Sequence, residues 1–382
     1  MFVLLFVLSG TAAAQTHSYI GSMHAHSAYS DGWPGSRPYD FFMSARNHGL
    51  DFMGGSDHSD SLGLPNSFSD YCVNPSNSQF DPTKSGCLLA DSVNPPDSFR
   101  KWDATLEQVV ATTTPKFTSF RGFEWTSDRY GHINVYFSKQ WENAKTDGGY
   151  VSMATFYDWL THSDGIATFN HPGDKKLSTS DPAFNWNDFT YVPAADAQMV
   201  GIETYNSASD FAAPGAHDGP PEGWYAHALD KGWHVGAIGA EDLGHHYGDD
   251  WGGPGQAKTV ILASSRSAAD LEAALKARRF YAVAGPGFRL DYTVDGNAMG
   301  SRLTRKSGAV LRFTARATDV AGRTLTGARL DLVTTGGAVV ASASGGRLDV
   351  RHRWVPGERW YFVRASQGGQ NIAYSSPVWM TG

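Results

Sequence analysis

The sequence predicts an α/β protein, with a seven-stranded (β/α)7 TIM-like barrel over residues 15–285 and a small all-β sandwich over residues 286–382. Two observations predict the barrel. Seven short, almost continuously apolar runs follow one another up to residue 284, and helical patterns separate several of them. A third observation predicts the sandwich, because apolar and polar residues alternate beyond residue 286 with glycine turns at short intervals. A chain of 382 residues is long enough for two such units.

The candidate barrel strands lack strict alternation, which suits a parallel sheet that is covered on both faces. They are YIGSM from Tyr19, LDFMGGS from Leu50, FTSFRGFEW from Phe117, INVYF from Ile133, GIATFN from Gly165, VGIETYN from Val200 and WHVGAIGA from Trp233. The helical stretch RPYDFFMSARNHG has Pro38 near its start and ends at Gly49, as helices often do. Strand–helix alternation over seven units favours a barrel over an open sheet.

The helical stretch SAADLEAALKARR begins at Ser267 with a capping-box pattern, and we expect it to be the last helix of the barrel. The runs that follow alternate in the way expected of a small antiparallel sandwich. They are LDYTV, VLRFTARA, ARLDLVT, AVVASAS, RLDVRHRW and RWYFVRAS.

Two local features predict export to a periplasmic or secreted location. Residues 1–14 contain a short apolar run followed by small residues, as in a signal peptide, and a buried first strand is the alternative. The two cysteines, Cys72 and Cys87, lie in a polar insert and are expected to form a loop-closing disulfide rather than two free thiols.

The overall charge argues against two classes of partner. The formal net charge is −7, the pI is near 6.0, and no run of lysine and arginine stands out. We therefore expect no nucleic-acid polymer and no membrane-surface patch, and no later segment is long and apolar enough to span a membrane. The oligomeric state is not indicated.

Histidines and acids follow the candidate strands. In a barrel of parallel strands the C-terminal ends share one rim, so these residues are expected to converge there. His24 and His26, at i and i+2 in a strand, point to the same side and can reach one cation. The residues at strand ends are His24, His26, Asp31, Asp57, His58, Glu124, His171, Glu241, Asp242, His245 and His246, and His132 joins them if its strand runs antiparallel.

Taken alone, each of these residues is better explained as an ordinary loop residue, since polar side chains are common in loops. Five of seven candidate strands deliver such a group, however, and the joint pattern predicts a metal site. A mixed nitrogen and oxygen donor set suits zinc, manganese or iron rather than calcium or magnesium.

The motifs resemble those of the PHP superfamily of metallohydrolases over about residues 17–284. They are His-Ala-His at 24–26 with Asp31 in Ser-Asp-Gly, Ser-Asp-His ending at His58, Phe-Glu ending at Glu124, Gly-His ending at His132, Asn-His-Pro-Gly around His171, and Asp242 followed by His245. The passage ALKARRFYAVAGP and the sandwich further resemble the exported branch that includes carbaryl hydrolase.

The resemblance implies a distorted barrel with two or three divalent metals. It implies a first site of His24, His26, Glu124 and Asp242, a second of Glu124, His132 and His171, and a third of Asp31, His58 and His245. The last motif of the family is Asp-x-His, whereas two residues separate Asp242 from His245 here, so His245 or His246 could be the final ligand. Asp57 is expected to orient His58.

We expect Glu124 and Asp242 to be the catalytic carboxylates of a metal-activated hydrolysis. Arg129, Lys175 and Asn206 are candidates for binding a small ester substrate, although lone surface charges are more often solvated. A phosphoesterase acting on small phosphate mono- or diesters is the first hypothesis. A carboxylic or carbamate ester hydrolase is the second, and a catalytically inactive binding protein is a third of another class.

Overall fold

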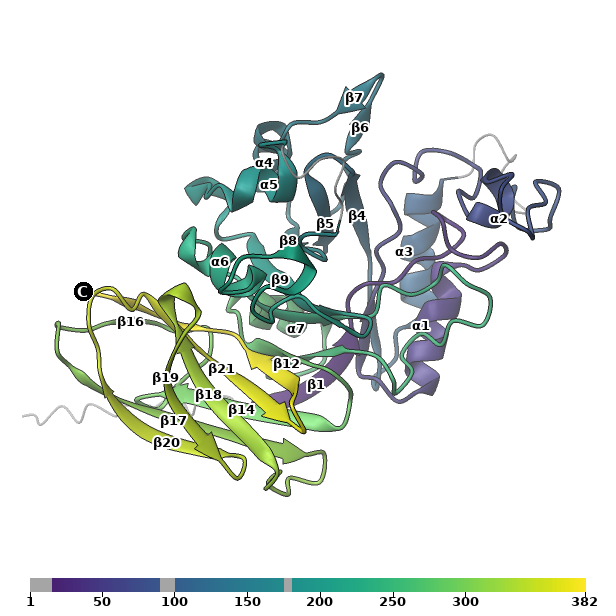
Figure 1. The fold of residues 1–382 in the computed structure, drawn as a ribbon. Coiled ribbons are helices and arrows are strands. Elements are labelled where there is room, and N and C mark those ends of the chain that lie inside the picture. The colour runs from purple at the N-terminus through teal and green to yellow at the C-terminus, as the bar shows by residue number, and fades with distance from the viewer. Residues whose placement is uncertain (1–15, 90–99, 175–180) are drawn as a thin grey trace, which may run out of the picture.

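A computed structural model describes residues 16–89, 100–174 and 181–382 of the chain, which form a mixed α/β protein with several sheets (Figure 1). The predicted signal peptide, residues 1–14, lies outside the described residues. One end of the molecule is made by helices and mixed sheets, and the other end is made by the C-terminal strands alone (Figure 1).

The first sheet of the N-terminal part joins strands from both ends of the predicted barrel. Strand β1 (His17–Ser22) pairs in parallel with β2 (Phe52–Gly54), which pairs in parallel with β3 (Thr118–Phe120). On its other side β1 pairs antiparallel with β12 (Lys258–Ala263), and β12 pairs antiparallel with β13 (Phe280–Val283).

The second sheet contains β4 (Gly122–Ser127), β5 (Gly131–Tyr136), β8 (Ile166–Phe169), β9 (Met199–Asn206) and β11 (Gly236–Ala240). Strands β8, β9 and β11 are parallel, but β5 runs antiparallel to both β4 and β8. Only three residues separate β4 from β5, and a connection that short can form only a hairpin. All seven predicted runs therefore form strands, but the run from Phe117 is divided between β3 and β4, and the strands lie in two mixed sheets rather than one uniformly parallel ring.

The longer helices all lie in the N-terminal part, and those expected near Pro38 and after Ser267 are among them. They are α1 (Pro38–Asn47), α3 (Lys101–Thr112), α4 (Met153–His162) and α7 (Ala268–Lys276). Ser152 and Ser267 accept hydrogen bonds from backbone N–H groups in the first turns of α4 and α7, as N-cap serines do. Shorter elements are α2 (Asp70–Val73), α5 (Phe184–Phe189), α6 (Trp224–Asp230), β6 (Lys145–Thr146), β7 (Gly149–Tyr150), β10 (Ser209–Asp210) and three 3-10 turns, η2 (Pro193–Ala195), η3 (Ala216–Asp218) and η4 (Thr335–Gly337).

The C-terminal strands form two layers. One is a four-stranded sheet in the order β15 (Asn297–Ala298), β14 (Phe288–Val294), β17 (Val310–Asp319) and β20 (Arg347–Arg353). The other contains β16 (Arg302–Thr304), β18 (Ala328–Thr334), β19 (Ala338–Ser344), β21 (Trp360–Gln367), β22 (Gln370–Ser375) and β23 (Val378–Thr381). Residues such as Phe313 and Leu332 from the two layers belong to one buried apolar cluster.

The second layer is not separate from the N-terminal part. Strand β22 pairs antiparallel with β13, so one 11-stranded sheet runs from β3 through β1 into the C-terminal strands. Such continuity is not visible in a sequence pattern, which reports strands but not their partners. The domain division at residue 286 stays a prediction.

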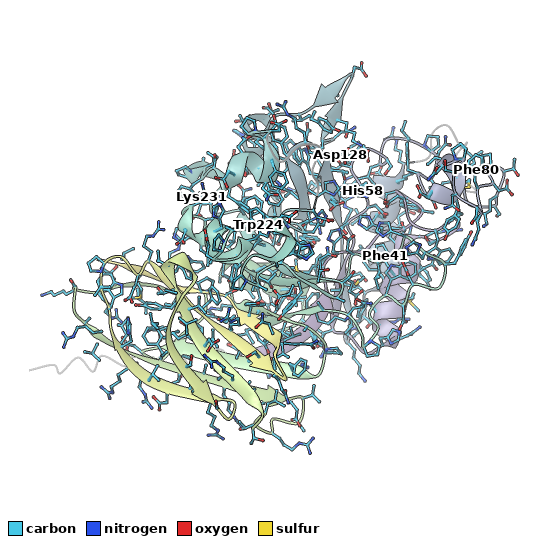
Figure 2. All side chains as sticks on the ribbon, in the orientation of Figure 1. Phe41, His58, Phe80, Asp128, Trp224 and Lys231 are labelled. Atoms are coloured by element: carbon cyan, nitrogen blue, oxygen red, sulfur yellow. A yellow bond between two sulfur atoms is a disulfide. The ribbon has the colours of Figure 1, made fainter. Side chains whose placement is uncertain are left out.

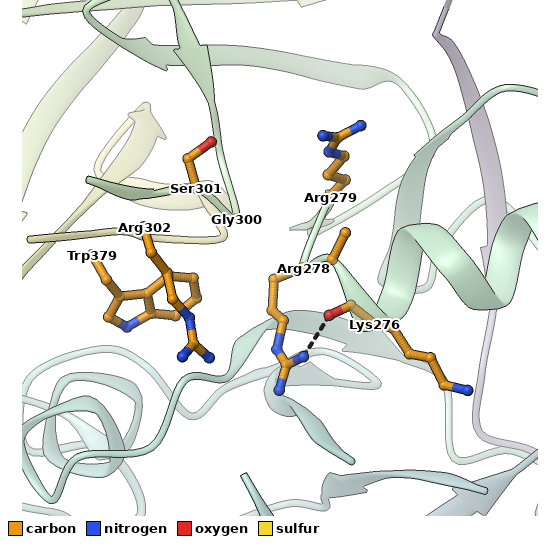
Figure 3. Close-up of a pocket in the computed structure, with 8 residues that line it drawn as sticks. Lys276, Arg278, Arg279, Gly300, Ser301, Arg302 and Trp379 are labelled. Atoms are coloured by element: carbon orange, nitrogen blue, oxygen red, sulfur yellow. Dashed lines mark hydrogen bonds between the residues drawn. The ribbon is translucent and has the colours of Figure 1, made fainter. Parts of the chain in front are cut away.

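A hollow of about 260 Å³ lies where the end of α7 meets β16 (Figure 3). Arg278 and Arg302 point to the same side of it. Arg278 is buried and donates to backbone carbonyls, including that of His234 at 2.8 Å, while Arg302 donates to Asp196 at 3.1 Å. Arg302 thus joins the C-terminal part to Asp196, whereas Arg278 holds together backbone carbonyls within the N-terminal part.

The predicted disulfide is confirmed. Cys72 and Cys87 are bonded, with Cα atoms 5.6 Å apart, and they close the insert that contains α2. Among the described residues, no helix is long and apolar enough to cross a membrane.

Candidate metal centre

The first histidine pair follows β1. His24 and His26 are buried, and their Nε2 atoms lie 3.1 Å apart. The segment that holds them is fixed by backbone pairing with the loop after β11, because Asp242 N–H donates to His24 O at 3.0 Å and His26 N–H donates to Leu243 O at 2.8 Å. Asp242 Oδ1 is 3.2 Å from His24 Nε2 and 3.0 Å from His26 Nε2. Three donor atoms therefore face one point.

Glu124 lies at the centre of the cluster and is 0% exposed. It is placed there because residues 57–59 pair with β4, with Glu124 N–H donating to Asp57 O and Ser59 N–H donating to Glu124 O. Its Oε1 is 3.3 Å from His24 Nε2, 3.1 Å from His132 Nδ1 and 3.3 Å from His171 Nε2. One carboxylate thus faces imidazoles that come from three different elements.

His132 supplies a test of whether a cation fits. It lies at the start of β5, opposite Thr126 of β4, so the antiparallel hairpin brings it to the cluster. Within the described part of the chain, its two buried ring nitrogens and Glu124 Oε2 make no hydrogen bond of normal geometry. Buried polar atoms are normally satisfied, and the two carboxylate oxygens of Glu124, one 3.1 Å from His132 Nδ1 and the other 2.7 Å from His58 Nδ1, form a donor set that fits a cation.

A third group opens toward solvent. His58 Nε2 is 3.1 Å from Asp31 Oδ2, and His245 Nε2 is 3.3 Å from the same oxygen. The side chains of Asp31 and His245 are 31% and 34% exposed. His246, by contrast, is exposed and is absent from the described groups of possible ligands, so the structure brings His245 and not His246 into the cluster.

The predicted ligands gather as three compact sets of donor atoms that could hold divalent cations. These sets are His24, His26 and Asp242; His58, Glu124 and His132; and His26, Asp31, His58 and His245. They differ from the predicted partition in that His26 and His58 each belong to two sets, and Glu124 is grouped with His58 rather than with His24. His171 belongs to none of the sets, although its Nε2 lies 3.3 Å from Glu124 Oε1. Figure 2 shows His58 in the middle of the molecule.

Electrostatics inside the cluster favours bound cations. Burial opposes a charge on His24, but nearby carboxylates, led by Asp242, hold its pKa well above the usual value. Burial also opposes the charge on Glu124, but the imidazoles of His132 and His58 keep its pKa well below the usual value. The carboxylates thus favour a positive charge at His24, whereas burial and the neighbouring His58 lower the pKa of His26 to about 4, and a divalent cation can supply the positive charge that the carboxylates favour.

Backbone conformation at the site departs from the common regions. His171 and Asp242 have φ of 27° and 52°, values that residues other than glycine rarely adopt. Such residues concentrate at functional sites, where the surrounding structure holds them in place.

Glu203, at the end of β9, orients two of the candidate ligands, which the sequence did not indicate. Its Oε1 accepts from His24 Nδ1 at 2.6 Å, and its Oε2 accepts from His171 N–H at 2.7 Å. Asn206, a predicted substrate residue, donates to Glu203 Oε2 at 2.9 Å and to Asp242 Oδ2 at 3.0 Å. Asn206 therefore lies at the centre, and its substrate role stays a prediction.

Asp57 has a different role from the expected one. Its carboxylate accepts from Ser27 N–H at 2.7 Å and from Ser30 Oγ at 2.7 Å, which fixes the loop between His26 and Asp31. His58 Nδ1 instead lies 2.7 Å from both Thr126 Oγ1 and Glu124 Oε2. A carboxylate next to a histidine in sequence can serve another loop entirely.

A buried ion pair supports the loop that begins at Asp242. Lys258 Nζ lies 2.5 Å from Glu241 Oε1, and both side chains are 0% exposed. Glu241 also accepts from Gly252 N–H, and Lys258 donates to Gly253 O, so the pair ties the two ends of the loop together. The lysine that opens the apolar run KTVILA is the signal that sequence reasoning passed over.

The remaining substrate candidates lie outside the cluster. Arg129, in the turn between β4 and β5, is 47% exposed and donates to Asp181 at 3.2 Å. Lys175 lies outside the described residues. Substrate roles for Arg129 and Lys175 stay predictions.

Comparisons with known proteins find only distant similarity. No family model matches the chain, and no curated protein matches it. A two-domain protein from Bacteroides vulgatus containing a predicted PHP-like metal-dependent phosphoesterase is 16% identical, with a TM-score of 0.47 over 95% of this chain and 96% of that one. An amidohydrolase from Chromobacterium violaceum is 12% identical, with a TM-score of 0.34 over 61% and 89% of the chains.

Endonuclease Q, solved with a DNA duplex, is also 12% identical, with a TM-score of 0.39 over 68% of this chain and 57% of that one. At these identities and TM-scores the similarities do not assign a function, which has to be argued from the site. The predicted absence of a nucleic-acid partner stays a prediction.

Proposed function

We propose that this protein is a metal-dependent hydrolase of small phosphate mono- or diesters, as its motif resemblance to the PHP superfamily implies. The observation that carries the proposal is Glu124, a fully buried carboxylate that faces the imidazoles of His24, His132 and His171 within 3.3 Å. A carboxylate between two sets of nitrogen donors is suited to bridge two cations.

The described residues can hold two or three zinc, manganese or iron ions. We assign His24, His26, Glu124 and Asp242 to one ion, Glu124 with His132 and His171 to a second, and Asp31, His58 and His245 to a third. Bound there, the ions would supply a water of lowered pKa and would neutralise charge on the substrate oxygens.

Two neighbouring side chains orient the candidate metal ligands. Glu203 holds His24 so that Nε2 faces the centre, and Asn206 holds one oxygen of Asp242 so that the other faces the two histidines. Because the Asp242 side chain is 21% exposed, its carboxylate can pass a proton from the attacking water to solvent. Glu124, which is fully buried, has no such path and is suited to bridging.

A phosphate ester suits this arrangement better than a carboxylic or carbamate ester. The third set of donors opens to solvent beside the buried pair, so several positive charges would surround the substrate. A phosphoryl group presents two or three charged oxygens, whereas a carbonyl develops charge on one during hydrolysis. Hydrolysis of carboxylic or carbamate esters is the alternative that the test below includes.

The test combines metal analysis with a substrate panel. Protein purified without added metal is analysed for bound metals and assayed on phosphomonoesters, phosphodiesters, carboxylic esters and carbamates. Glu124→Gln should lower turnover on the order of 10²-fold or more and reduce metal content. Glu272→Gln, which removes an acid from the exposed face of α7, is the control and should change neither.

Wild-type turnover and metal content in Glu124→Gln would refute the bridging role. Turnover of carboxylic or carbamate esters alone would replace the proposed substrate class. Full metal content with no turnover of any substrate would favour the binding protein.

We also propose that the protein works in the periplasm or outside the cell. The Cys72–Cys87 disulfide supports this, since such bonds persist mainly in oxidising compartments. Cell fractionation of the full-length chain tests it, and a cytoplasmic pool with both thiols free would contradict it.

A further inference from the structure

Charge is divided unevenly along the chain. Residues 286–382 contain 12 arginines and one lysine against six acidic residues, a net charge of +7. The whole chain has −7, so residues 1–285 carry −14 (−7 minus +7). The modest total therefore conceals a basic C-terminal part attached to an acidic N-terminal part.

Five of these arginines share one face of a sheet. In β17 and β20, buried residues such as Phe313 and Leu348 alternate with solvent-facing ones, and residues paired across the two strands point to the same side. The solvent-facing arginines, which we call the arginine face, are Arg312, Arg316, Arg347, Arg351 and Arg353. Figure 1 shows β17 and β20 on the side of the molecule away from α1 and α3.

The register places like charges opposite one another. Arg312 pairs with Arg351 and Arg316 pairs with Arg347. Like charges directly opposite in a sheet are destabilising. Arg312 is compensated by Asp349, which it contacts at 2.9 and 2.6 Å.

The other four arginines are compensated less closely, because Asp291 of β14 is paired with Arg316 and Asp349 lies between Arg347 and Arg351, but neither acid forms an ion pair with these four. In the described ranges, no carboxylate lies within 4.0 Å of a charged nitrogen of Arg316, Arg347, Arg351 or Arg353. Arg316 Nε and Arg347 Nη2 instead converge on a neutral oxygen, Thr324 Oγ1, at 3.1 and 3.3 Å. Two guanidinium groups thus meet at an uncharged atom, and Arg316 Nη2 also donates to a carbonyl, that of Gly322, at 2.7 Å.

Protection of a sheet edge explains only part of this pattern. Charged residues on an edge strand hinder pairing with another chain, and β20 is an edge strand. Strand β17, however, lies between β14 and β20, so Arg312 and Arg316 protect no edge. The arrangement instead fits a surface for an anionic partner.

We propose that the arginine face binds an anionic lipid surface through phosphate headgroups. Guanidinium groups bind phosphate oxygens in a bidentate manner, and the face consists of neighbouring antiparallel strands rather than a groove for a linear polymer. Its solvent-facing neighbours include Thr314 and Val310, the latter 52% exposed and paired with Arg353, but no aromatic ring on which bases could stack. The net −14 of residues 1–285 would turn that part away from the lipid.

The proposal is tested by co-sedimentation of the full chain with phosphatidylcholine vesicles that contain about 30% phosphatidylglycerol. This anionic lipid gives the vesicles a strongly negative surface. Vesicles of phosphatidylcholine alone are the lipid control. The test variant is Arg316→Gln with Arg347→Gln. Its matched control is Arg100→Gln with Lys139→Gln, two cations 83% and 84% exposed in the N-terminal part.

Wild type and the control variant should bind the anionic vesicles, release them in high salt, and leave the neutral vesicles unbound. The test variant should bind about 25-fold more weakly, from roughly fivefold per arginine near an anionic surface. Circular dichroism with an unchanged melting temperature establishes that the variant is folded.

Three results would overturn the proposal: no preference for anionic vesicles, equal loss in both variants, or tighter binding to duplex DNA than to vesicles at equal phosphate concentration. Light scattering that shows salt-sensitive self-association through the same arginines would assign the face to a second copy of the chain instead. Metal content and ester hydrolysis should be unaffected in the test variant, which separates this proposal from the proposed function.

Discussion

Replacing Glu203 by glutamine should weaken metal binding at His24 without unfolding the protein. Glu203 is 1% exposed and accepts hydrogen bonds from His24 Nδ1, His171 N–H and Asn206 Nδ2 at 2.6, 2.7 and 2.9 Å. A carboxylate can only accept, so His24 carries a proton on Nδ1, and Nε2, which faces His26 and Asp242, is the nitrogen that a cation would bind in place of a proton.

Glutamine cannot satisfy all three donors. If its oxygen accepts from His171 and Asn206, its amide N–H meets His24 Nδ1 and drives the imidazole proton to Nε2, the atom that faces the cations. If the amide is flipped, its N–H groups face the N–H donors of His171 and Asn206, and neither hydrogen bond can form. Carboxylate partners of metal-binding histidines are worth about 10- to 100-fold in metal affinity, or roughly 1.4 to 2.7 kcal/mol.

The assay is competition with a chromophoric chelator, together with metal content per chain and the pH dependence of metal uptake. Glu203→Gln should lose affinity by about this factor, and Glu272→Gln should not. If Glu203→Gln binds metal as wild type does, the inferred orientation of His24 is wrong. Lost turnover with unchanged affinity would place Glu203 at the substrate instead.

Three further outcomes are expected. Lys258→Met leaves Glu241 as a buried unpaired charge, so it should lower the free energy of unfolding by about 3–5 kcal/mol in denaturant unfolding. Adding Glu241→Gln should recover much of this loss. A loss below about 1 kcal/mol in Lys258→Met would contradict the reasoning. Replacing Cys72 and Cys87 by serine opens a loop with a sequence separation of 15 and should lower the free energy of unfolding by about 3 kcal/mol. Alkylation of both thiols in non-reduced, denatured wild type would show that no bond exists. Burial lowers the pKa of Lys101 to about 7. Between pH 7 and about 10 the unfolded chain therefore binds more protons than the folded chain, so stability should rise with pH in that range. Lys101→Met should lack this rise, and equal slopes of stability against pH in both proteins would refute the reasoning.

Local patterns in the sequence were sufficient for the elements and for the candidate ligands. The strands that carry the candidate ligands come from short apolar runs, and a serine precedes helices α4 and α7, because burial of a strand and capping of a helix depend on neighbouring residues. His24, Glu124 and Asp242 were found because they directly follow or end such runs, and strand ends converge in this class of fold.

The pairing of the strands was harder to predict from the sequence. The seven strands were expected to be parallel, yet β5 is antiparallel to both neighbours, and the sheet continues through β13 and β22 into the C-terminal part. The three-residue turn before β5 carried the signal for its direction. No local signal exists for the pairing of β13 with β22, since it depends on hydrogen bonds between segments far apart in the chain.

What the sequence by itself determined is therefore which residues have metal-binding chemistry, because that chemistry belongs to the side chain and its place at a strand end. Only the tertiary structure decided which groups meet. Glu203 contacts His24 across 179 residues, and Arg316 stands opposite Arg347 because two strands pair in one register. Such contacts follow from how the whole chain packs, since residues distant in sequence become neighbours only when the core that both elements share is buried.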